Sequence, residues 1–167
     1  MILGMSLATF TTMHVIISLI AIVTGIIVIF GLLGSNRMPG MTAIFLLFTI
    51  LTSVTGFLFP FNGVTPGDII GALSLVLLAI ACIALYSMKL SGAWRWIYVV
   101  TAVVSLYFNV FVLVIQSFLK IPALHALAPG EPPGGPVFGV IQGIVLVFFV
   151  LVIIGAVRRF RPIATYA

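Results

Sequence analysis

Hydrophobic residues run along this chain in long blocks, and polar residues interrupt them only briefly. A bilayer core about 30 Å thick requires about 20 apolar residues per helix, and each block is close to that length. Such blocks must be helical, because no water satisfies the backbone there, and they lack the polar and apolar alternation of an outer-membrane barrel. The pattern predicts an all-α integral membrane protein, a single domain over residues 1–167 with a bundle of five transmembrane helices. The predicted helices are Ala8–Leu33, Met41–Phe59, Asp68–Met88, Trp94–Leu119 and Val137–Phe160.

The composition agrees with this class. Hydrophobic residues make up 63% of the chain and charged residues 5%, against about 25% charged in soluble domains. The first block is too long for the apolar core of a secretion signal, and no basic stretch precedes it. We therefore interpret the first block as a transmembrane helix. The chain has one cysteine, Cys82, which excludes both a disulfide framework and a C-x-x-C-H site for covalent haem.

The basic residues predict how the bundle is oriented. Lysine and arginine concentrate in cytoplasmic loops, and with five crossings all but one of the seven basic residues fall on one side. Lys120 alone falls on the other side. We therefore expect the amino terminus outside and the carboxyl terminus in the cytoplasm. The bilayer itself explains these few membrane-adjacent charges, so nucleic acid is not an expected partner. The residues on the cytoplasmic side are Arg37, Lys89, Arg95, Arg158, Arg159 and Arg161.

Polar residues gather toward the outer half of the predicted bundle. On the fourth helix, spacings of three, four and seven place Tyr98, Thr101, Ser105, Asn109 and Gln116 on one face. This clustering indicates an outward-facing polar pocket. The alternative is ordinary helix association, in which an interhelical hydrogen bond contributes about 0.6 kcal/mol. The candidate pocket residues are His14, Ser18, Asn109, Gln116, Lys120, His125 and Gln142, with Asn62, Asp68 and Glu131 at the rim.

The segment between the last two helices is longer than a connection requires. Lys120–Pro136 exceeds the usual 2–8 residues between neighbouring helices. A proline suits the first turn of a helix, so Ile121–Ala128 is predicted to form a short interfacial helix. The segment either covers the outer mouth of the pocket or is a solvent-exposed linker. On the fifth helix, a row of small residues predicts a close helix-packing surface: Gly135, Gly139 and Gly143.

Two metal-centred alternatives rest on the histidines. Haem b needs two axial ligands at matching depth, which His14 and His125 would supply if the loop folded back into the bundle. Copper(I) favours thioether and imidazole ligands, and Met5 and Met13 lie near His14. No acid lies mid-helix as a pump or coupled carrier would need, and no phosphate-binding glycine loop is present. We therefore name no catalytic residue and do not expect an enzyme.

The stretch YFNVFVLVIQSFLKIPALHALAPGEPP, residues 107–133, resembles small uncharacterised multi-helix proteins of bacterial inner membranes. The resemblance implies a location in the bacterial cytoplasmic membrane and implies no activity. Taken with the polar residues, the sequence favours a protein that binds a small ligand or lipid, or that serves as a subunit of a larger membrane complex. One alternative is a redox protein holding haem b or quinone near His14 and His125. The other is a homo-oligomeric pore with the glycine row as its interface.

Overall fold

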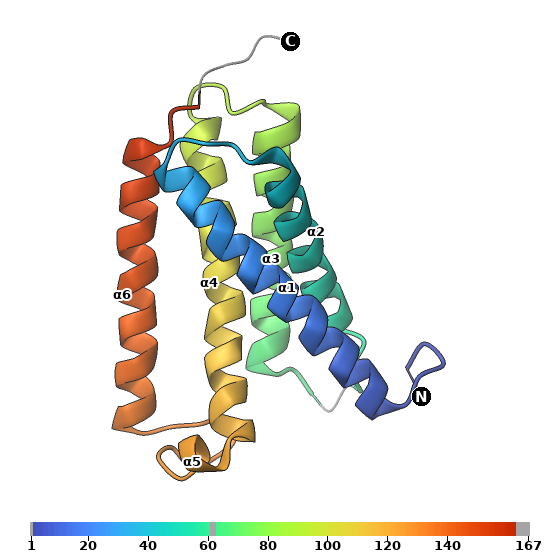
Figure 1. The fold of residues 1–167 in the computed structure, drawn as a ribbon. Coiled ribbons are helices and arrows are strands. Elements are labelled where there is room, and N and C mark those ends of the chain that lie inside the picture. The colour runs from blue at the N-terminus through green and yellow to red at the C-terminus, as the bar shows by residue number, and fades with distance from the viewer. Residues whose placement is uncertain (1, 61–62, 163–167) are drawn as a thin grey trace.

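The computed structural model describes residues 2–60 and 63–162, and its long elements are all helices (Figure 1). In this described part of the chain, five helices are long and apolar enough to cross a membrane, with α3 and η1 taken as one. This confirms the helical, five-segment pattern that the sequence predicts. The elements are α1 (Leu7–Leu33), α2 (Pro39–Gly56), α3 (Pro66–Cys82), the π-helix η1 (Ile83–Ser87), α4 (Trp94–Lys120), α5 (Pro122–His125) and α6 (Pro136–Arg159).

Proline sets where several helices begin. Pro39, Pro66, Pro122 and Pro136 each occupy the first turn of a helix, where the missing N–H is not needed. The starts of α2 and α3 therefore come two residues earlier than the apolar pattern predicts. Two segments are shorter than expected. The second helix ends at Gly56 rather than three residues later, and the predicted helix over residues 121–128 is helical only over α5.

Four of the long helices stand side by side in the order α6, α4, α3, α2, and α1 crosses them diagonally (Figure 1). The crossing depends on glycine. A Cβ added to Gly25 would lie 2.6 Å from Leu106 Cδ1 and 2.9 Å from the Phe45 ring, and one added to Gly155 would lie 3.1 Å from Leu33. The carboxyl-terminal half of α1 therefore packs closely on α4 and α6.

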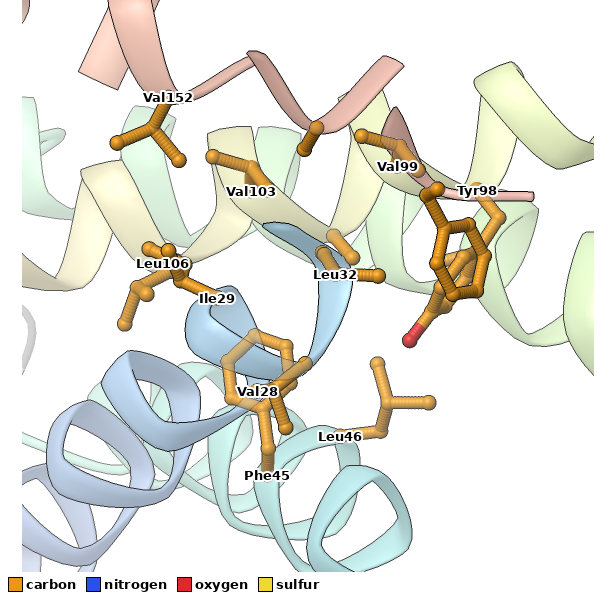
Figure 2. Close-up of a cluster of buried hydrophobic side chains, with 14 of the residues drawn as sticks. Val28, Ile29, Leu32, Phe45, Leu46, Tyr98, Val99, Val103, Leu106 and Val152 are labelled. Atoms are coloured by element: carbon orange, nitrogen blue, oxygen red, sulfur yellow. The ribbon is translucent and has the colours of Figure 1, made fainter. Parts of the chain in front are cut away.

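The buried core lies in one half of the bundle, around this crossing (Figure 2). That half includes the α1–α2 connection, the η1–α4 connection and the end of α6, and we call it the basic end. The opposite half, with the α2–α3 and α4–α6 connections, is called the loop end. The core side chains labelled in Figure 2 are Val28, Ile29, Leu32, Phe45, Leu46, Tyr98, Val99, Val103, Leu106 and Val152.

The glycine row on α6 does not form a close contact within the chain. A Cβ added to Gly139 or Gly143 would meet nothing within 4 Å, and the same holds for Gly135. The face of α6 that is buried against the bundle carries other residues, Gln142, Phe149, Val152 and Ala156. The predicted row therefore lies beside the contact surface rather than on it, because the larger side chains fill the space between α6 and α4.

Candidate functional site

His14 is the most closely constrained polar side chain near the loop end. Its Nδ1 lies 2.7 Å from Thr55 Oγ1 on α2. The Thr55 hydroxyl has a single proton, and the Leu51 carbonyl lies 2.7 Å from its oxygen. When the proton points to that carbonyl, Thr55 Oγ1 accepts from His14 Nδ1–H, and Nε2 of the neutral imidazole is left as a hydrogen-bond acceptor. In the other tautomer the Thr55 hydroxyl donates to Nδ1 instead.

Aromatic rings hold the imidazole against the end of α2. The Phe59 ring meets the His14 ring edge-on at 5.2 Å between centroids, and Phe10 packs on Phe59 at 5.0 Å. A Cβ on Gly56 would lie 3.9 Å from His14 Cε1. Neither α4 nor the long loop supplies a partner for His14 among the described residues. The histidine predicted to face α4 faces α2 instead.

A groove of about 490 Å³ runs along the neighbouring face of α1 and is bounded by Phe48 of α2. Its lining is apolar except at the amino-terminal end of α1. There Thr12 Oγ1 donates to the Ala8 carbonyl at 3.0 Å, and Thr9 Oγ1 lies 2.9 Å from Ser6 Oγ. Each hydroxyl oxygen keeps acceptor capacity. The lining residues are Thr9, Thr12, Met13, Ile16, Ile17, Ile20 and Phe48.

A second polar position joins α6 to α4. Gln142 is only 8% exposed, and its Nε2 donates to the Phe111 carbonyl at 3.1 Å. Its Oε1 is buried, and so is Asn109 Nδ2 on α4; neither atom has a partner in the described parts of the chain. Gln142 is thus a polar contact between two helices, as ordinary helix association predicts.

None of the remaining candidates bonds to the side chain of His14 or Gln142. Ser18 Oγ donates to the His14 carbonyl within α1 at 2.8 Å. His125, on α5, is half-buried, and its Nδ1 has no partner among residues 2–60 and 63–162. Asp68 caps α3, because its Oδ2 accepts from the Thr65 N–H and its own N–H donates back to Thr65 Oγ1. The others are exposed: Gln116, Lys120 and Glu131.

These positions give no support to the expected convergence of His14, Asn109 and Gln116 under a lid. The predicted shared face of α4 is split, with Ser105 fully buried and Gln116 exposed. Element α5 contacts α4 alone among the helices, and the long loop lies under the ends of α4 and α6 rather than across α1 (Figure 1). The rim candidate Asn62 lies outside the described residues.

The same separation argues against both metal sites. His14 bonds α2 while His125 belongs to α5, which contacts only α4, so the two imidazoles do not form an axial pair. Met13 lines the groove on one face of α1, His14 points to Thr55 on another, and Met5 lies in the turn that pairs it with Ile2. The described residues contain no group of three or more His, Cys, Asp or Glu side chains placed to hold a metal ion.

The sequence pattern predicts neither the groove nor the contact of His14 with Thr55. The groove does leave a signal, since its α1 residues recur at spacings of three and four. These residues are mostly apolar, so in the sequence they cannot be distinguished from a stripe that faces lipid. No protein-family model matches the chain, and neither a curated protein nor a solved structure matches it.

Proposed function

We propose that this chain is a multi-pass protein of the bacterial cytoplasmic membrane that binds a lipid-like amphiphile in the groove between α1 and α2. Its amino terminus and loop end face outward. Support for the membrane location comes from the five long apolar helices. Support for the orientation comes from the basic residues, which apart from Lys120 belong to the basic end.

The observation that carries the binding proposal is the groove itself. Its volume of about 490 Å³ is open to the surroundings along its length rather than enclosed, which suits an extended chain better than a compact ligand. Six of its seven lining residues come from one face of α1, so an extended chain can lie along the helix. Thr9 and Thr12 add hydroxyl oxygens at the end where α1 begins.

Bulk lipid competes for the groove, and this competition restricts which chemical class of ligand can bind selectively. Lipid tails are as apolar as leucine, so transfer from bilayer to groove brings no hydrophobic gain. Selectivity must come from shape or from a polar group that meets Thr9 or Thr12. The ligand class is therefore an amphiphile with an extended apolar tail and a compact polar end. A quinone with an isoprenoid tail fits this class, whereas haem b does not enter the proposal because the histidines are apart.

The binding experiment compares ligand retention in variants of α1. Ile16→Trp fills the groove, while Val15→Trp adds the same bulk on a neighbouring exposed position outside the groove lining. The proteins are purified in mild detergent, and extracted lipids are quantified by mass spectrometry. We expect one amphiphile class to be enriched over bulk phospholipid in the parent and in Val15→Trp, and lost in Ile16→Trp. Equal recovery from all three proteins would refute the proposal.

The orientation is tested separately by labelling introduced cysteines in intact cells, in a background where Cys82 is replaced by serine. We expect a membrane-impermeant reagent to label Glu131→Cys and to leave Arg161→Cys unlabelled until the cells are opened. Both positions are exposed in the structure, so accessibility within the protein does not bias the comparison. The reverse pattern would overturn the orientation.

A further inference from the structure

Three segments of the chain are tied together at the basic end (Figure 1). The Arg161 N–H donates to Ser35 Oγ in the α1–α2 connection at 2.8 Å. Arg95, in the first turn of α4, donates from Nη1 to the Val157 carbonyl at 3.0 Å and also to the Phe160 carbonyl. The end of α6 is thus bonded both to the α1–α2 connection and to α4. These hydrogen bonds fix the relative positions of the three segments that form this surface.

The charge at this end is of one sign. The only two acids of the chain, Asp68 and Glu131, belong to the opposite end. Arg95 already has carbonyl partners, whereas Arg161 is exposed next to Ser35, and Arg158 and Arg159 are exposed one turn earlier. Within residues 2–60 and 63–162, no acidic side chain pairs with these guanidinium groups.

Arg37 gives this surface a specific donor. The connection around it is held by local bonds: its carbonyl accepts from Thr42 Oγ1 at 2.9 Å, and Asn36 Oδ1 accepts from the Met38 N–H at 3.1 Å. Arg37 Nε is buried and has no partner in the described residues. Arg37 as a whole is half-buried, so a headgroup would meet the exposed part of its guanidinium group rather than Nε. Phosphate oxygens match the guanidinium fork in two-point hydrogen bonds.

We propose that Arg37 and Arg161 bind the phosphate of an anionic phospholipid headgroup between the α1–α2 connection and the end of α6. The site lies where helices long enough to span a bilayer end, which is the depth of the phosphate layer. Exposed apolar side chains continue from it along the helices, including Phe30 (70% exposed) and Leu151 (63% exposed), where acyl chains can lie. The inference requires membrane insertion and is independent of the groove.

The test is native mass spectrometry of the detergent-purified full chain with added phosphatidylglycerol or phosphatidylcholine. We expect the parent to retain phosphatidylglycerol in preference to phosphatidylcholine, and Arg37→Gln or Arg161→Gln to weaken that preference on the order of ten-fold. Arg37→Lys keeps the positive charge but lacks the two-point donor geometry of the guanidinium group, so it should lose part of the preference for phosphatidylglycerol. Lys120→Gln removes one charge at the loop end and Lys89→Gln removes one from the neighbouring connection, and both should retain the preference.

Several outcomes would overturn this inference. Equal losses in Arg37→Gln and Lys120→Gln would mean that net charge alone attracts the lipid. Full competition by millimolar inorganic phosphate would mean that the site takes free phosphate rather than a headgroup. If Arg37→Gln unfolds, as thermal unfolding would show, the comparison of Arg37→Lys and Arg161→Gln with Lys89→Gln decides the matter, and unchanged preference in both arginine variants would refute the site.

Discussion

Gly25→Ala should destabilise the protein, whereas Gly139→Ala should not. A Cβ at Gly25 would lie 2.6 Å from Leu106 Cδ1 and 2.9 Å from two carbons of the Phe45 ring. Carbon atoms in favourable contact are about 3.5–4.0 Å apart, so α1 must move away by about 1 Å or both side chains must shift. Phe45 is 1% exposed and has little space to move into. At Gly139 an added Cβ meets nothing within 4 Å.

The expected magnitudes follow from these contacts. Overpacking in a close-packed core costs about 1–3 kcal/mol, and replacing a helical glycine by alanine returns up to about 1 kcal/mol. The overpacking term is the larger of the two, so we expect Gly25→Ala to lower the free energy of unfolding by up to about 2 kcal/mol. Gly139→Ala keeps only the favourable contribution and should be neutral or stabilising. The two substitutions are chemically identical, so the difference between them isolates the helix crossing.

The assay is reversible unfolding in mixed detergent micelles titrated with sodium dodecyl sulfate, followed by the fluorescence of Trp94 and Trp96. Gly143→Ala serves as a second control, since its added Cβ also meets nothing within 4 Å. Equal destabilisation by Gly25→Ala and Gly139→Ala would refute the reasoning about the α1 crossing. Destabilisation by Gly139→Ala that depends on protein concentration would instead indicate self-association through the α6 glycines, as the pore alternative requires.

The remaining predictions concern hydrogen bonds made by three side chains, Arg95, His14 and Gln142. Arg95→Gln should weaken the attachment of the α6 end and speed amide hydrogen exchange near Val157, with partial rescue by Arg95→Lys; unchanged exchange would contradict that attachment. In a double-mutant cycle, His14→Phe and Thr55→Val should show a coupling free energy of about 0.6 kcal/mol, the average for an interhelical hydrogen bond. Zero coupling would mean that the 2.7 Å contact between His14 and Thr55 contributes nothing to the free energy of unfolding. Gln142→Leu should be neutral or stabilising in thermal unfolding, because it loses one such bond but removes a buried Oε1 without a partner; a marked loss would show that Oε1 is bonded in the protein.

The sequence alone predicts the helices well because bilayer thickness and backbone hydrogen bonding leave few alternatives for long apolar blocks. Helix ends are less accurate where capping decides them, as at Pro39 and at the Thr65–Asp68 capping box. The row at Gly135, Gly139 and Gly143 failed as an intrachain contact because spacing identifies a small face without identifying its neighbour.

The candidate site also divides into what residue spacing predicts and what the packing of the helices decides. Spacing places Asn109 and Gln116 on one face of α4, yet it does not reveal that α1 crosses at Gly25 and brings His14 to Thr55 on α2. The composition and order of the residues determined the helical class, the segments and the charge asymmetry, since each depends on one segment and its solvent. Only the tertiary structure decided the crossing of α1, the partner of His14, the groove and the surface around Arg37 at the basic end. Each of these depends on which helices meet, at what level and at what angle.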